Sequence, residues 1–186
     1  SGRLFGIREL LERAGAEFAA LRGPEKLPLV ELTGEIYLRS VDFSNDSIIE
    51  KLEARGLRVH LSSKTEWLNY CGHMGRRTKE HVGLTDHFSK LVQHRIESAA
   101  LAAMSPRMGW PVPPTVTEVL DAARPYVNDA LEGEAVLTVG GPLHEWRRGQ
   151  IVAVVSVGPL ECVPTKIAEA QFHHVAEHEG LLSLTL

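Results

Sequence analysis

Four short apolar segments, separated by stretches with helical periodicity, constrain the fold of this chain more than any other feature. They are residues 28–33, 57–63, 151–157 and 181–186. Apolar runs that barely alternate with polar residues are typical of parallel strands covered on both faces. The helical stretches provide crossover connections. The sequence therefore predicts an α/β three-layer sandwich, Rossmann- or flavodoxin-like, with a parallel four-stranded sheet in the order 2-1-3-4.

The segments between these runs have the periodicity and the end signals of helices. Apolar residues recur in them at helical spacing, with glycine or proline at several of the ends. The clearest of these segments are 4–22, 46–56, 84–104 and 164–178. Residues 34–43 are expected to form a loop. The stretch from the second strand to the third is mostly helical, so we predict a single α/β domain over residues 1–186 with a helical insert at about 64–149.

Proline and glycine interrupt two helical patterns inside this insert. Pro125 falls within 117–131, and a proline inside a helix removes a backbone donor and kinks or splits it. Gly140-Gly141-Pro142 weakens the helical prediction for 134–148. Both segments are still predicted to be helical, with a break at the proline in the first of them.

Composition and charge argue against several classes of function. The chain has 186 residues, of which 44% are hydrophobic and 24% are charged, as in an ordinary globular domain. Its formal net charge of −4 argues against nucleic acid or an anionic membrane as the main partner. No apolar run approaches the roughly 18 residues of a membrane helix, and no signal-peptide pattern opens the chain. A cytoplasmic location is therefore expected. Neither a P-loop nor a GxGxxG motif is present, so the sequence gives no support for nucleotide binding through either motif.

The two cysteines, Cys71 and Cys162, lie far apart and form no CxxC motif. A structural disulfide is not expected without a secretory signal. Two thiols cannot complete a four-thiolate site, so a metal site held by this chain alone would need some of its nine histidines. His174 and His178 have the i, i+4 spacing that can chelate a metal, but cationic residues near the end of a helix are the more ordinary explanation.

The predicted strand order places a topological switch point between the first strand and the third. Ligands of open parallel sheets bind outside the carboxyl ends of the strands, at such a switch point. The loops that should meet there are residues 33–46 and 158–164. We therefore expect a functional site where these two loops converge.

The first of these loops is rich in polar side chains. Glu35 is the candidate catalytic residue, and a merely solvated carboxylate is the alternative. Gly34 before it indicates a close approach of two backbones. Asn45 and Asp46 precede a helix, where short polar residues most often serve as caps.

The second loop carries Cys162, two residues before Pro164 at the predicted start of a helix. Backbone N–H groups and the helix dipole stabilise a thiolate in that position. Such a thiolate could ligate a metal or an iron–sulfur cluster, or act as a nucleophile if a histidine served as its base. The alternative is a small buried hydrophobic side chain, which is a common role for cysteine.

Two segments of the chain resemble one known family. LTGEIYLRSVDFSNDSIIEKLEARGLRVHLSSKTEWLNY, residues 32–70, is similar to a GEIY…ND…L…G segment of proteins related to the 2-hydroxyacyl-CoA dehydratases and their activators, the CoA-substrate-specific enzyme activases. GEAVLTVGGPLHEWRRGQIVAVVSVGPLECVPTKIAEAQF, residues 133–172, resembles a second segment of that group, with PLECVP where relatives have PFGCMP. The resemblance spans about residues 29–186.

This resemblance implies a function for the longer protein to which the chain would belong. Dehydratase subunits of that superfamily hold a 4Fe-4S iron–sulfur cluster on three cysteines and dehydrate a 2-hydroxyacyl-CoA after a separate ATP-dependent activator has supplied one electron. Cys162 falls on the family's cysteine, which makes it the candidate cofactor and metal ligand. Glu35 and Glu134 fall on acidic positions of the family's motifs, without an assigned role.

The same resemblance implies partners and limits for this chain. Other domains of the same polypeptide would supply the remaining thiolates, and an ATP-dependent activator or an acyl-CoA substrate would bind the whole protein. On its own the chain is expected to bind no cluster and to be catalytically inactive. Two alternatives stay open: a non-catalytic scaffold that docks neighbouring domains, and a small-molecule-binding regulatory domain.

Overall fold

A computed structural model of the chain describes residues 6–24, 26–78, 84–108, 113–128 and 130–186, except for the side chains of 76–78, 84–87, 90, 94 and 106–107. Contacts divide the chain into two compact units. One consists of Ser1–Glu25 and Arg76–Pro113, and the other of Lys26–Gly75 and Pro114–Leu186. The second, which we call the sheet unit, contains every strand described below.

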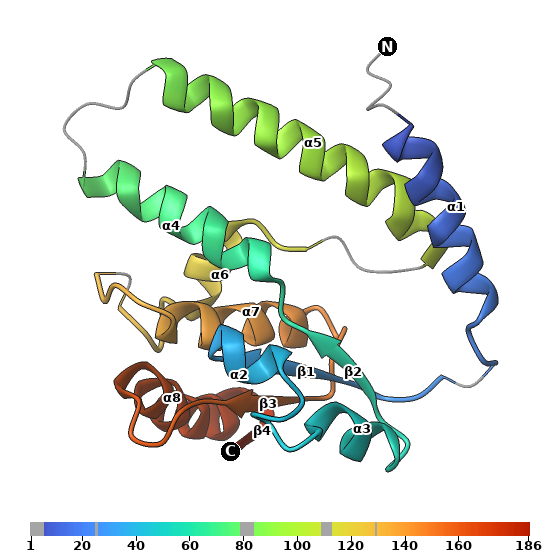
Figure 1. Cartoon of the computed structure of the whole chain (residues 1–186). Helices are drawn as coiled ribbons and strands as arrows, with labels where there is room; N and C mark the ends of the chain where they lie inside the picture. Colours follow the sequence, from blue (N-terminus) through green and yellow to red (C-terminus); the bar gives the residue numbers. More distant parts are fainter. Residues whose placement is uncertain (1–5, 25, 79–83, 109–112, 129) are drawn as a thin grey trace. The chain divides into compact units, whose positions relative to one another are not determined.

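The sheet unit is built on a four-stranded parallel sheet in the order β2-β1-β3-β4 (Figure 1). The strands are β1 (Leu29–Gly34), β2 (Arg58–Leu61), β3 (Ala153–Val157) and β4 (Leu182–Thr185). In the central pair, Leu32 of β1 lies opposite Val155 of β3, and Gly34 lies opposite Val157. Helices connect and flank the strands, which confirms the predicted three-layer α/β fold and its strand order.

Two short helices cover one face of the central strands. Alternate residues of β1 and β3 point to this face and form a buried cluster: Val30, Leu32, Val155 and Val157. Side chains of α2 (Ile36–Ser40) and α3 (Ile48–Glu53) pack on it. Helix α3 lies inside the predicted range. Helix α2 occupies residues for which the sequence predicted a loop, because Leu38 finds an apolar partner surface that a polar-looking segment does not reveal.

The opposite face carries the larger core. Helices α6 (Val116–Ala123), α7 (Ala135–Arg147) and α8 (Val163–Glu179) contribute to it, together with the first turns of α4 (Lys64–Thr78). Phe172, Leu143 and Leu181 are among its fully buried side chains. Because α7 contacts both β1 and β3, it belongs to the sheet unit although the sequence placed it inside the helical insert.

The sequence predicted that both faces of the sheet are covered, and this expectation is wrong at the β4 edge. Leu182 and Leu184 of β4 lie opposite Ala153 and Val155, on the face that α2 and α3 cover farther along the sheet. Their exposed fractions are 68% and 50%. Over β4 this face is therefore open among the described residues, since neither short helix extends that far.

Local sequence signals explain where the helices begin and end. Thr115 forms a capping box with Glu118 at the start of α6. The helix ends at Ala123, before Pro125, and the described residues 124–128 and 130–131 are not helical, so the second half of the helix predicted over 117–131 is wrong. Helix α7 continues through Gly140 and Gly141 despite the weak helical signal. A methyl group on Gly140 would lie 2.3 Å from the carbonyl oxygen of Val119, so the glycine is required for α6 to approach α7 this closely.

A polar junction joins α7 to the end of α8. The Glu179 carboxylate accepts hydrogen bonds from Arg147 Nε at 2.8 Å, from Arg147 Nη2 at 2.6 Å and from the Tyr126 hydroxyl at 2.8 Å. Bidentate arginine–carboxylate pairs are the stronger kind of ion pair. This junction therefore fixes the end of α8 against α7 and against the segment that follows α6.

We expect Glu179→Ala to lower the free energy of unfolding by about 1–3 kcal/mol, because it leaves two donors without their acceptor. Glu177→Ala is the matched control: Glu177 is exposed and pairs only loosely, at 3.4 Å and 3.7 Å, with His173 and His174. The control should lose less than about 1 kcal/mol. Urea denaturation followed by circular dichroism measures both, and equal losses would contradict the role given to the junction.

The other unit contains α1 (Ile7–Ala20) and α5 (Leu84–Met108), which pack against each other. Arg22, just after α1, donates a hydrogen bond to the carbonyl of Met108. Several large apolar side chains of this helix pair are exposed, among them Leu10, Phe18, Phe88 and Leu91. Among the described residues, no helix combines the length and the apolar character needed to cross a membrane.

Candidate functional site

The carboxyl ends of β1 and β3 meet at the predicted switch point. The Glu35 amide donates a hydrogen bond to the carbonyl of Val157 at 2.9 Å, just beyond the last paired residues of the two strands. Gly34 has a φ of +103°, and a methyl group added to it would lie 2.0 Å from the same carbonyl oxygen. The close backbone approach inferred from this glycine is therefore confirmed.

Glu35, the candidate catalytic residue, is the N-cap of α2. Its Oε2 atom accepts a hydrogen bond from the Leu38 amide at 2.8 Å, which satisfies one of the free N–H groups of the helix. The carboxylate is thus held in place by a local structural bond. A catalytic role for Glu35 stays a prediction.

Glu134 lies near Glu35 and is the N-cap of α7. Burial raises the pKa of Glu134, and the neighbouring Glu35 carboxylate raises it further, whereas Arg39 and a hydrogen bond from the Ile36 backbone lower it. The two acidic positions singled out by the family resemblance therefore come together in space. They meet where α2 and α7 begin.

Although Ser47 is the N-cap residue of α3, Asn45 satisfies a free N–H group at the start of that helix. Its Oδ1 atom accepts a hydrogen bond from the Ile48 amide at 3.2 Å, and its Nδ2 atom donates to the carbonyl of Leu38 at 2.7 Å. Asp46 pairs instead with Lys51. Asn45 thus links the start of α3 to α2, and neither residue points to a ligand.

Cys162 is the N-cap of α8, at the end of the loop that follows β3. Pro164 occupies the first turn of the helix, as the sequence predicted. The residue is half-buried, its thiol is free, and its side chain makes no capping hydrogen bond. The thiol is therefore only partly buried, and its role as a ligand, a nucleophile or a packing side chain stays a prediction.

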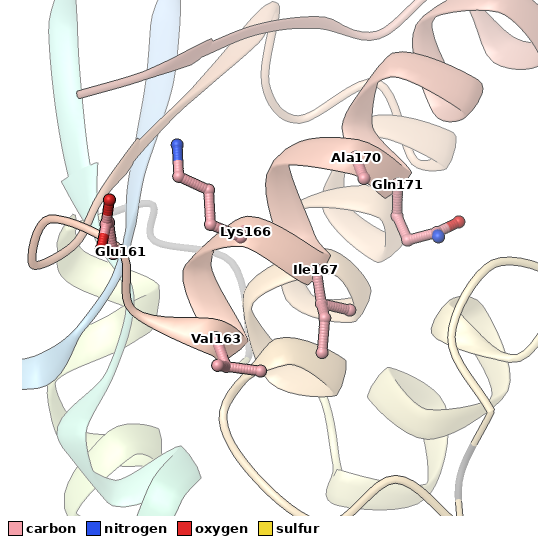
Figure 2. A pocket seen from close by; sticks show the side chains of 6 residues that line it. All are labelled: Glu161, Val163, Lys166, Ile167, Ala170 and Gln171. Atoms are coloured by element: carbon pink, nitrogen blue, oxygen red, sulfur yellow. The ribbon is translucent and has the colours of Figure 1, made fainter.

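A shallow hollow of about 390 Å³ lies along the first turns of α8 (Figure 2). Six residues line it: Glu161, Val163, Lys166, Ile167, Ala170 and Gln171. The hollow begins next to Cys162 in the sequence, but Cys162 is not one of its lining residues. Its mixed apolar and charged lining, open to solvent, differs from the enclosed pocket expected of a small-molecule site.

A second polar centre lies on the α7 side of the sheet, where the sequence analysis proposed nothing. Glu31 lies in the middle of β1 with an exposed fraction of 4%. Its Oε1 atom accepts a hydrogen bond from the Ser62 hydroxyl at 2.6 Å. Burial raises the pKa of Glu31 from 4.5 to about 8, an effect larger than the opposing effect of the Ser62 hydrogen bond.

Two further carboxylates, Glu66 of α4 and Glu145 of α7, accompany Glu31. A methyl group on Gly141 would lie 3.2 Å from Glu66 Oε1 and 3.7 Å from Glu31 Oε1, so the two carboxylates approach the same backbone position. Burial raises the pKa of Glu66 to about 7 and also raises that of Glu145. Arg39 of α2, buried as well, supplies positive charge to Glu31 and Glu66. We call Glu31, Glu66, Glu145 and Arg39 the buried carboxyl cluster.

One signal in the sequence could have revealed this cluster. Glu31 stands between Val30 and Leu32 in a run otherwise typical of a buried strand. A charged residue in such a position is rarely buried without a partner or a shifted pKa. Its partners could not be inferred, because they come from three separate helices.

The remaining candidate ligands do not assemble into a metal site. His173, His174 and His178 follow one another along α8, with the rings of His174 and His178 stacked at 6.5 Å. Cys71 is exposed on α4. Across the part of the chain that the structure describes, no three histidine, cysteine, aspartate or glutamate side chains could hold a metal ion together. The side chains of His87 and His94 lie outside the described residues.

Compared with protein-family models, with curated proteins and with solved structures, the chain matches none of them. Its function is therefore inferred from its own residues and geometry.

Proposed function

We propose that this chain is a domain of a protein related to the 2-hydroxyacyl-CoA dehydratases and their activators. In that protein, the carboxyl edge of its sheet helps to seat a 4Fe-4S cluster that takes part in electron transfer toward acyl-CoA dehydration. Cys162 provides one ligand, and other domains of the polypeptide provide the rest. A cytoplasmic location belongs to the same proposal.

The position of Cys162 is the observation that supports this proposal. Its free, half-buried thiol stands at the N-terminus of a helix of 17 residues, beside the switch point of a parallel sheet. Thiolates are the usual ligands of iron–sulfur clusters, and backbone N–H groups near the sulfur tune such sites.

The donor atoms in this chain fit one ligand position and not a whole site. Cys162 is a suitable donor, but the described residues bring no two further candidate ligands to it. The other cysteine, Cys71, is exposed on α4. When bound, the cluster would supply one-electron transfer, and the part of this chain would be to hold one iron at the Cys162 sulfur.

Replacing Cys162 in the full-length protein tests the proposal. After anaerobic reconstitution with iron and sulfide, we expect Cys162→Ser to lose most of the cluster signal in electron paramagnetic resonance, since thiolate ligation is lost. Cys71→Ser is the matched control and should retain the signal. A full signal in the Cys162 variant, with the same iron content as the unmodified protein, would refute the ligand role.

A second candidate function is a scaffold that docks neighbouring domains. The observation that favours it is the set of exposed apolar side chains on α1 and α5, including Phe18 and Phe88. Scattered apolar residues are ordinary on a surface, but several on one helix pair are typical of an interaction face. Phe18→Ser should then weaken association with a separately produced neighbouring domain, whereas Cys162→Ser should not.

A further inference from the structure

The buried carboxyl cluster has no part in the function proposed above, although ionisable groups are rarely buried without a consequence. Glu31, Glu145 and Arg39 each have an exposed fraction of 4%. All of them belong to the sheet unit: Glu31 and Arg39 come from the neighbouring elements β1 and α2, and Glu145 comes from α7, which is far away in the sequence.

The charges in this cluster do not balance when every group is ionised. Arg148 lowers the pKa of Glu145, but Glu31 and Glu66 would then share the one guanidinium of Arg39, and an uncompensated charge is strongly unfavourable in the interior. Hydrogen bonds do not make up the difference: Glu31 Oε2, Glu145 Oε2 and Arg39 Nε are buried without a hydrogen-bond partner among the described residues. The folded cluster must therefore retain at least one proton.

We propose that Glu31, Glu66, Glu145 and Arg39 form a proton-controlled latch, in which a bound proton keeps the first turns of α4 docked on the sheet. With the proton in place, Glu31 is neutral, and the positive charge of Arg39 favours the ionised form of Glu66 without a second carboxylate beside it. When the proton leaves, a second negative charge faces Glu66 across Gly141.

The groups that face the cluster set the pH range of this latch. Charged and titratable side chains approach from every packed element: Glu31 and His60 from the sheet, Arg39 and Glu35 from α2, Glu66 from α4, and Glu134, Glu145 and Arg148 from α7 and its end. Burial lowers the pKa of His60, so this ring adds no positive charge near neutral pH. Since the pKa of Glu66 is about 7 and that of Glu31 about 8, the cluster titrates around and just above neutral pH.

Glu66 is the side chain of the cluster that can move out to solvent. Glu31 is fixed in a central strand and Glu145 lies on α7, and both are almost fully buried. Glu66 is only half-buried and belongs to the first turn of α4. Repulsion from an ionised Glu31 is therefore relieved most easily if Glu66 turns to solvent and the start of α4 loosens. Tyr70, which is buried one turn later, limits how far this opening extends.

Hydrogen exchange of the whole chain at about pH 6 and about pH 9, corrected for the intrinsic pH dependence of exchange, tests the latch. We expect the protection of amides 68–72 in α4 to fall about tenfold or more relative to β3, since one unit of a pKa shift corresponds to a factor of ten. In Glu31→Gln this difference should shrink to the smaller part that comes from Glu66, whose pKa of about 7 also lies between the two pH values. In Glu53→Gln, which changes an exposed carboxylate on α3, it should persist.

Two outcomes would overturn the proposal. One is protection that falls equally in α4 and in β3 of the unmodified chain, which indicates global unfolding and requires no variant. The other is a folded Glu31→Gln chain in which the pH dependence at α4 is as large as in the unmodified chain. Glu66→Gln provides a second folded variant, and its α4 protection should be independent of pH.

Discussion

The unmodified chain is expected to lose stability as the pH rises from about 5 to about 8, and Glu31→Gln should abolish most of this loss. Burial raises the pKa of Glu31 from 4.5 to about 8, so the folded chain retains a proton that the unfolded chain releases. Below the unfolded pKa both states are protonated, and the stabilisation is complete. Above it, the free energy of unfolding falls by about 1.4 kcal/mol per pH unit until the folded pKa is reached.

Glutamine cannot titrate, so the variant lacks this slope while its Oε1 atom can still accept the Ser62 hydrogen bond. The stability of the variant relative to the unmodified chain should therefore improve by several kcal/mol between about pH 5 and about pH 8. Urea denaturation at these two pH values and one between them measures the slope.

Glu53→Gln, on the surface of α3, should follow the unmodified chain at every pH. A Glu31→Gln chain with an unchanged slope would show that Glu31 is not the buried group that binds the proton. Some slope should remain even in the expected case, because the pKa of Glu66 is also raised, to about 7.

Gly34→Ala is expected to lower the free energy of unfolding by at least about 3 kcal/mol. Two effects add up at this position. The φ of +103° is unfavourable for any residue with a side chain, and the new methyl group would lie 2.0 Å from the Val157 carbonyl oxygen. The strands β1 and β3 would have to separate at their carboxyl ends, where the Glu35 amide bonds the same carbonyl.

Gly56→Ala separates these two effects. Gly56 also has a positive φ, +78°, but an added methyl group there would meet nothing within 4 Å. Its cost should be limited to that of the backbone conformation, about 1–2 kcal/mol. Thermal and urea unfolding measure both variants. Equal losses would mean that the close approach of β1 and β3 adds nothing beyond the backbone conformation.

The course of the strands could be predicted because their signals are local. An apolar run such as 151–157 indicates a strand wherever it occurs, and helical stretches between such runs leave few ways to connect parallel strands. Helix α2 was missed because only five residues form it and its single apolar anchor, Leu38, needs the α3 face of the sheet. The helical prediction for α7 was weakened by Gly140. The reason for a glycine there is visible only in the folded chain, where α6 packs too closely to leave room for a side chain.

The candidate site was predictable to a similar extent. The convergence of the loops after β1 and β3 followed from strand order alone, and Cys162 lies at the helix N-terminus where the sequence placed it. The cap made by Glu35 could not be foreseen, because it depends on the helix α2 that the sequence did not predict. Likewise, the open face over β4 depends on how far α2 and α3 reach.

The sequence by itself determined the fold class, the strand order, the glycine contact at the switch point and the place of Cys162, since each depends on residues that are neighbours in the chain or on a general rule of chain connection. Only the tertiary structure decided that Glu31, Glu66, Glu145 and Arg39 share one buried space. Each of these side chains alone is an ordinary charged residue. Their pKa values change because folding withdraws these groups from water, fully for three of them and partly for Glu66, and no local pattern along the chain records that event.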